Sequence, residues 1–303
     1  MKLGREMLIL AAVAGSASAQ VSDVLYSITA TNGDGTASFS ISQSELEAIG
    51  GTEGVISTDG LNWSLNGPLE LRSTDGTLIA TLESASSFAS LSGANPDTTL
   101  GGGLGGSAGG SGSTFGTDPA VNVSFSVLAG ASDTVFTISS SELTFTPLTN
   151  VVGMATAAIT LTDTLGDGAT ITGLVDSGNI GTGPNGRDIA GSPSGVTHQY
   201  GAFVDGSAAD NVITPFGFLL DSPFSVVGFG SDTISEDDPG AGFRPVGLDP
   251  VSSISSQFSF TLSANDTASG TSRFVIAGQI VPAPATFSAL AGMGILASRR
   301  RRR

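Results

Sequence analysis

Apolar and polar side chains alternate along much of this chain of 303 residues. Residues 121–127 read VNVSFSV and residues 61–65 read LNWSL, whereas long runs with helical spacing are absent. A period of two places the apolar side chains on one face of an extended strand. The pattern therefore predicts that β-strands are the main secondary structure.

Turn-forming residues separate these strands. Residues 31–36 (TNGDGT) lie between two alternating segments, and their residue types tolerate positive φ, which predicts a hairpin. The sequences GDG at 166–168 and SANDTASG at 263–270 predict two further hairpins, the second at the end of the fold. Helix is expected in one or two turns at most, where SELE at 44–47 fits a capping box.

Short strands with turns rich in Gly, Asn and Asp predict an all-β fold. The expected body is a large antiparallel β-sandwich or jelly-roll-like domain over residues 20–280. Residues 101–116 (GGGLGGSAGGSGSTFG) are expected to form a flexible loop within it, because they offer little apolar surface to bury. Two modules divided at this loop are the alternative, since residues 39–46 (FSISQSEL) resemble residues 136–143 (FTISSSEL).

The first 19 residues are typical of a secretory signal peptide. Lys2 and Arg5 precede the short apolar segment 7–15, and Ala17-Ser18-Ala19 provides small residues for cleavage. The apolar segment is shorter than the roughly 20 residues that span a bilayer. We therefore expect export and cleavage by signal peptidase after Ala19.

Between the two ends the chain is strongly acidic and lacks cysteine. Residues 20–281 hold 26 of the 27 acidic residues and four of the 11 basic residues, a net charge of −22. Such a body repels phosphate backbones, so nucleic acid is not expected as a partner. The absence of cysteine excludes disulfides, thiolate metal sites and cysteine nucleophiles.

Motifs for catalysis are missing from the sequence. His198 is the single histidine, and neither G-x-S-x-G nor H-E-x-x-H occurs. A Ser-His-Asp triad would require His198 as its base. A surface or hydrogen-bonded structural role requires no catalytic partners and is the preferred interpretation of His198. The prediction is that the protein is not an enzyme and carries no cofactor.

Calcium is the one ligand that the acidic residues suggest, because hard cations bind several oxygens on flexible loops. The candidate ligands are Asp232, Glu236, Asp237 and Asp238 in residues 231–240, Asn32 with Asp34, and Asp163 with Asp167. None of these segments fits the D-x-[DN]-x-[DN]-G pattern, and turn formation alone explains Asn and Asp at such positions.

The C-terminal segment, residues 281–303, has three parts in order: a proline-containing opening, the mainly apolar residues 285–297 and a basic end. The opening contains Pro282, Ala283 and Pro284, and the end contains Arg299, Arg300, Arg301, Arg302 and Arg303. This order resembles the PEP-CTERM sorting tail of exported bacterial proteins. Ala283 replaces the usual glutamate, as in the Pro-Ala-Pro variant of planctomycete-like proteins, which leaves the specificity of the processing enzyme open.

The resemblance implies that an exosortase-like membrane protease recognises this segment and cuts near the prolines. The arginines are expected to stay on the cytoplasmic side. The thirteen residues 285–297 would form a helix of about 20 Å against a hydrocarbon core of about 30 Å, which suits a transient inner-membrane anchor.

The sequence thus predicts a structural or adhesive protein of the cell surface or extracellular matrix. Its partners beyond the processing enzymes would be extracellular polysaccharide or other surface proteins. A calcium- or glycan-binding surface module is the alternative, and a hydrolase is the third hypothesis.

Overall fold

The computed structural model describes residues 20–21, 24–42, 45, 54–57, 60–65, 67–90, 119–175, 184, 188–190, 196–205 and 212–280. Strands dominate these residues, so the prediction of an antiparallel all-β fold is confirmed. The predicted signal peptide (1–19), the Gly-rich segment (101–116) and the C-terminal segment with its predicted helix (281–303) lie outside the described residues.

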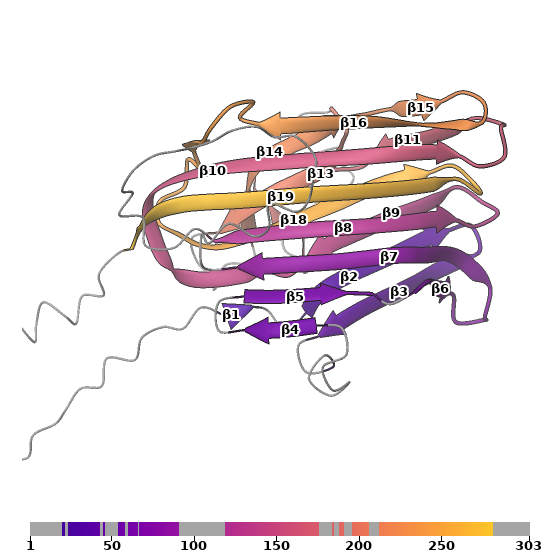
Figure 1. Ribbon diagram of the computed structural model, residues 1–303. Helices are drawn as coiled ribbons and strands as arrows, with labels where there is room; N and C mark the ends of the chain where they lie inside the picture. The colour runs from indigo at the N-terminus through magenta and orange to yellow at the C-terminus, as the bar shows by residue number, and fades with distance from the viewer. Residues whose placement is uncertain are drawn as a thin grey trace, which may run out of the picture.

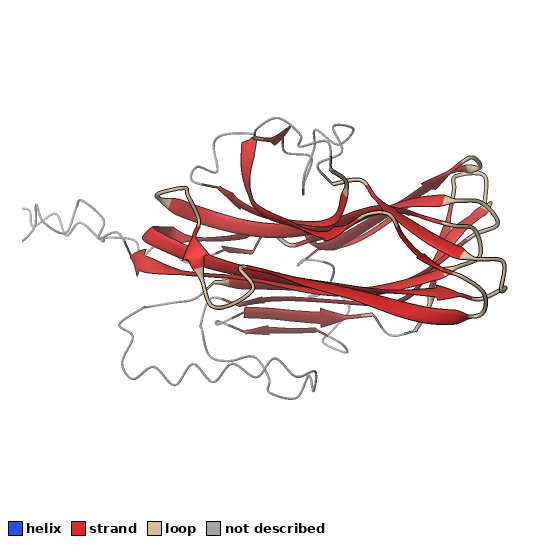
Figure 2. Ribbon diagram, turned by 90° about the horizontal axis from the view of Figure 1, so that it is seen from above, coloured by secondary structure: helices blue, strands red, loops and turns tan. Residues whose placement is uncertain are grey.

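The strands form two facing layers of a β-sandwich-like body (Figure 2). The order of the first layer, seen face-on in Figure 1, is β16 (Gly230–Asp238), β10 (Leu143–Asp163), β19 (Thr267–Ile280), β8 (Ala120–Ala129), β7 (Leu78–Ser90), β5 (Gly60–Ser64) and β4 (Gly54–Ser57), with β6 (Leu69–Arg72) also beside β7. The order of the second layer is β14 (Val212–Asp221), β13 (His198–Asp205), β18 (Val251–Leu262), β9 (Thr134–Ser140), β2 (Val24–Asn32) and β3 (Gly35–Ser42). All of these pairs are antiparallel.

Shorter strands complete the sheet. They are β1 (Gln20–Val21) beside β10, β11 (Ala169–Gly173) beside β15 (Phe224–Val226) and β18, β12 (Asp188–Ile189) parallel to β14, and β17 (Arg244–Pro245) beside β10. The long strand β10 starts beside β18, where Leu143 pairs with Ile254, and continues beside β19 in the first layer. Through β10 the two layers belong to one curled sheet.

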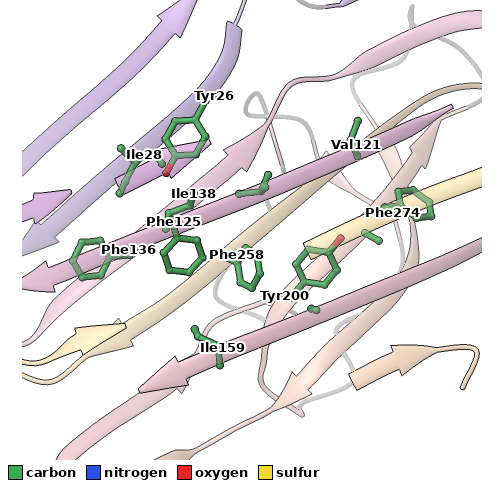
Figure 3. Packing of buried hydrophobic residues seen from close by; sticks show 14 of the residues in the cluster. Tyr26, Ile28, Val121, Phe125, Phe136, Ile138, Ile159, Tyr200, Phe258 and Phe274 are labelled. Atoms are coloured by element: carbon green, nitrogen blue, oxygen red, sulfur yellow. The ribbon is translucent and has the colours of Figure 1, made fainter. Parts of the chain in front are cut away.

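The inward-facing side chains of both layers pack into one main hydrophobic core (Figure 3). Phe258 lies at its centre, with ring centroids 5.0 Å from Phe125 and 4.9 Å from Tyr200. Strands on both sides of residues 91–118 contribute to this core, because β7 pairs with β8 and β2 pairs with β9.

In the described part of the two similar octapeptides, residues 39–42 of β3 and residues 136–140 of β9 lie on opposite sides of β2. Ile28 of β2 pairs with Phe39 of β3 on one side and with Ile138 of β9 on the other. Both neighbours run antiparallel to β2, so β3 and β9 run parallel to each other. The similarity therefore relates two strands of one layer and does not separate two cores.

One predicted hairpin is confirmed and two are wrong. β2 and β3 pair from Asn32↔Gly35 onward, and the Asn32 side chain accepts a hydrogen bond from the Asp34 amide at 2.9 Å. The turns after β10 and after β18, however, connect strands of different layers, since β10 and β19 pair in the first layer while β11 and β18 pair in the second. Both are crossovers because the strands that they join bury their apolar faces against each other across the core.

A reciprocal capping pair occurs two residues before the predicted one. The Ser42 hydroxyl accepts a hydrogen bond from the Glu45 amide at 3.2 Å, and the Glu45 carboxylate accepts one from the Ser42 amide at 2.7 Å. The hydrogen bonds that the Ser42 amide and hydroxyl donate to the Glu45 carboxylate lower the pKa of this carboxyl. Glu45 is helical, while its immediate neighbours lie outside the described residues, so the prediction for 44–47 stays a prediction.

Candidate functional site

Four crossovers between the layers lie side by side at one end of the body. They comprise residues 130–133, 164–168, 227–229 and 263–266. Within each layer, the strands that begin or end at these crossovers are neighbours: β16, β10, β19 and β8 in the first layer, and β15, β11, β18 and β9 in the second. We refer to this end as the turn end. The first and last described residues lie at the opposite end, because Gln20 pairs with Thr144 and Ile280 with Leu148 near the start of β10 (Figure 1).

Asp163 organises the crossover that follows β10. The residue is 3% exposed, and its carboxylate accepts three backbone hydrogen bonds, from the amides of Leu165 at 3.1 Å, Gly166 at 2.6 Å and Gly168 at 2.7 Å. Both glycines have positive φ, 82° and 99°, which lets the turn wrap around the carboxylate. Three charge-assisted hydrogen bonds stabilise a buried carboxylate without requiring a cation.

Asp266 joins this crossover to the next one. The residue is 1% exposed, and its carboxylate accepts hydrogen bonds from the Thr164 amide at 3.4 Å and the Ser263 hydroxyl at 2.5 Å. Burial raises the pKa of the Asp266 carboxyl, and the negative charges of Asp163 and Asp167 add to that rise. The fold therefore accommodates Asp266 better when it is protonated.

Together, Asp163, Asp167 and Asp266 form the candidate functional site. Each offers a carboxylate oxygen, and these oxygens lie within 4.8 Å of one another. Calcium binds six to eight oxygens at 2.3–2.6 Å, so one ion could contact all three carboxylates. The sequence pairs Asp163 with Asp167 in one turn, but it gives no signal for Asp266, which the chain topology brings to them.

The other predicted calcium ligands do not converge. Residues 230–238 form the regular strand β16, so the expectation of a flexible acidic loop is wrong. Glu236 accepts a hydrogen bond from the Leu220 amide at 2.6 Å, and Asp238 forms an ion pair with Arg244 at 2.6 Å. Glu236 thereby links β16 to β14, the edge strands of the two layers. Arg244 makes a second link between them, because it is held by Asp238 and also donates a hydrogen bond to the Phe216 carbonyl of β14.

His198 pairs with a carboxylate at the edge of the second layer. Its Nε2 lies 3.2 Å from an oxygen of Asp221, and its ring lies 5.7 Å from that of Phe218. The other ring nitrogen, Nδ1, is buried and has no hydrogen-bond partner in the structure. No hydroxyl therefore completes a triad with His198 and Asp221 in the part of the chain that the structure describes.

Exposed apolar side chains lie at the same turn end as the carboxylates. Val227 is 95% exposed and Phe229 is 80% exposed, both between β15 and β16. A Cβ on Gly166 would lie 2.5 Å from the Phe229 ring, so this ring covers the crossover that follows β10. Sequence patterns did not indicate that these side chains remain outside the core.

Comparisons with known proteins give no relative for this body. A scan against family models, a search of curated proteins and a search of solved structures each found no match.

The predicted processing residues Ala19, Pro282, Ala283, Pro284 and Arg299 to Arg303 lie outside the described residues. Within the described ranges, no helix combines the length and apolar character needed to cross a bilayer.

The raised pKa of Asp266 predicts a pH-dependent effect of Asp266→Asn. A raised carboxyl pKa contributes stability that is present below the unfolded-state pKa and is lost as pH rises through the folded-state pKa. The neutral amide should therefore keep or raise the melting temperature relative to wild type at pH 7, and this advantage should shrink at pH 4. Calorimetry at pH 7 and pH 4 tests this prediction, and an equal loss of stability in Asp266→Asn at both pH values would contradict it.

Proposed function

We propose that the protein is an exported, non-catalytic component of the cell surface or extracellular matrix, sorted through its C-terminal segment. The single observation that carries this proposal is the order of parts in residues 281–303: prolines, an apolar stretch and five terminal arginines. In this proposal signal peptidase cuts after Ala19, and an exosortase-like membrane protease processes the segment near Pro282 and Pro284.

The arrangement of the body is consistent with tethering at one end. Residues 20 and 280, which border the two predicted processing segments, both lie at the end opposite the four crossovers. Until the C-terminal segment is cut, a body held through residue 280 would direct the turn end, with Val227 and Phe229, away from the membrane. This geometry keeps the turn end clear of the membrane while the precursor awaits processing.

The proposal extends to the fold type. β8 and β9 pair with β19 and β18, so two consecutive strand pairs cross together from one layer to the other. This wrapping supports a jelly-roll-like classification of the sandwich. Folds of this kind host many functions, so the classification adds no activity.

Mass spectrometry of the exported protein tests the sorting proposal. The mature chain should begin at Gln20 and end near Pro284, without the five arginines. Replacement of both Pro282 and Pro284 with alanine should leave unprocessed precursor in the membrane fraction, whereas deletion of Arg299 to Arg303 should reduce its retention there. Released protein that still ends at Arg303 would refute processing.

Calcium binding is a second candidate function, favoured by the proximity of Asp163, Asp167 and Asp266 at the turn end. A ligand that binds the folded state raises stability in proportion to the logarithm of its concentration above Kd. Calcium should then raise the melting temperature over EDTA, and Asp167→Asn should diminish that rise. An equal rise in both proteins would remove this candidate.

A further inference from the structure

The outer face of the first layer presents hydroxyl groups in regular rows across five strands. The registers of β16, β10, β19, β8 and β7 align three such rows, which are Thr233–Thr160–Ser269–Ser126–Ser84, Ser235–Ala158–Thr271–Ser124–Ser86 and Ser231–Thr162–Thr267–Leu128–Thr81. Every position except Ala158 and Leu128 carries a hydroxyl. Neighbouring strands lie about 4.8 Å apart, and successive outward residues of one strand about 6.8 Å apart.

These rows contain no charged residue, although the body carries a net charge of −22. Surfaces of soluble proteins normally mix charges throughout. The carboxylate of Glu83 borders the rows at the bulge of β7 and accepts a hydrogen bond from Ser126 at 2.7 Å. The hydroxyls of Thr160 and Thr233 lie 2.7 Å apart, so adjacent strands already support hydrogen bonding along a row.

A fourth row borders the hydroxyls and contains polar atoms without partners. It consists of Asp237, Thr156, Arg273, Asn122 and Phe88. Arg273 Nε and Asn122 Oδ1, on directly paired residues, are buried atoms that lack a hydrogen-bond partner. Desolvation also lowers the pKa of Arg273, which has no ion pair among the described residues. A donor, an acceptor and the partly exposed ring of Phe88 thus lie beside the rows.

The outer face of the second layer also carries hydroxyls, such as Ser38, Thr29 and Thr137, but it is partly closed toward β9 and β18. Ser139, Gln257 and Ser259 point to that side but are buried. A small cluster of Val175, Phe203 and Ile213 packs over the same side of the second layer. The three rows of the first layer, by contrast, contain no buried residue across all five strands, so the first layer carries the more extensive set of open hydroxyls among the described residues.

We propose that this face binds a neutral polysaccharide chain laid across the strands. The inference rests on the proposed surface function and names its ligand class. Hydroxyl rows at strand spacing can exchange hydrogen bonds with successive sugar units, and Phe88 can pack against the apolar face of one ring. Three rows without charge on an acidic body match an uncharged polymer, whereas anionic polymers and further copies of this chain are repelled.

Affinity electrophoresis of the exported protein tests this proposal with two soluble polymers. Hydroxyethyl cellulose, which is neutral, should retard the wild-type protein, and alginate, which is anionic, should not. Thr160→Lys, at the centre of the first row, should raise the dissociation constant for hydroxyethyl cellulose by about tenfold. Thr160→Ser, which keeps the hydroxyl, should bind like wild type.

Thr29→Lys is the matched control, because Thr29 also points outward from a central strand, between Ser38 and Thr137 of the second layer. It should leave binding unchanged. Ser269→Lys repeats the test in the same row if Thr160→Lys lowers the melting temperature. Absence of retardation by hydroxyethyl cellulose, retardation by alginate, or equal effects of Thr29→Lys and the first-layer variants would overturn the proposal. The terminal masses of the same preparation report processing separately, so the two proposals can fail independently.

Discussion

Replacement of Asp163 with alanine is expected to lower the free energy of unfolding by about 3–5 kcal/mol. The carboxylate is buried and accepts the amides of Leu165, Gly166 and Gly168. Its removal leaves these amides without their acceptor and relaxes the crossover that joins β10 to β11. Denaturant unfolding followed by circular dichroism measures the change.

Asp163→Asn and Asp167→Asn distinguish the causes of this effect. The Asp163→Asn variant keeps one acceptor oxygen, so its free energy of unfolding should lie between that of wild type and that of Asp163→Ala. Asp167 is exposed, and Asp167→Asn should change stability by less than about 0.5 kcal/mol. Equal stabilities of Asp163→Ala and Asp167→Asn would show that the crossover does not depend on this carboxylate.

Phe258→Ala should lower the free energy of unfolding by a similar amount, about 3–5 kcal/mol, for a different reason. Phe258 is fully buried, and its ring packs edge-on against Phe125 and beside Tyr200 (Figure 3). Truncation leaves a cavity between the layers that the rigid sheets cannot close. Thermal unfolding of the purified protein gives the loss directly.

Phe229→Ala is the control for this substitution because it removes the same ring from an 80% exposed position. Its expected effect on stability is below about 0.5 kcal/mol. Similar losses from the two variants would mean that Phe229 packs against the turn end as firmly as Phe258 packs in the core.

Local patterning was sufficient to predict the strands but not their connections. Alternation at 121–127 correctly gives a strand with Val121, Val123, Phe125 and Val127 inward. Turn residues at 166–168 and 263–266 show where the chain reverses, yet the same residues serve a hairpin and a crossover equally well. Long-range pairing of β10 with β19 and of β11 with β18 decides between them, and no local signal encodes it.

The candidate site was likewise only partly predictable from the sequence. Asp163 and Asp167 share a turn and are visible as a pair in the sequence, whereas Asp266 reaches them through the pairing of β10 with β19. The acidic run at 232–238 suggested a loop because Asp and Glu are poor strand formers. In β16 they occupy the exposed edge of the first layer, where charge discourages pairing with other chains.

The position of β19 has a mechanical consequence. This strand is the last described one, it runs through the middle of the first layer, and it pairs along most of its length with β10 on one side and β8 on the other. A pull applied at residue 280 against a load at the turn end acts along the strand axis. Both ladders then bear the force in shear, with many hydrogen bonds sharing it at once. Such loading resists rupture far better than peeling a strand from an edge, where the bonds fail one after another.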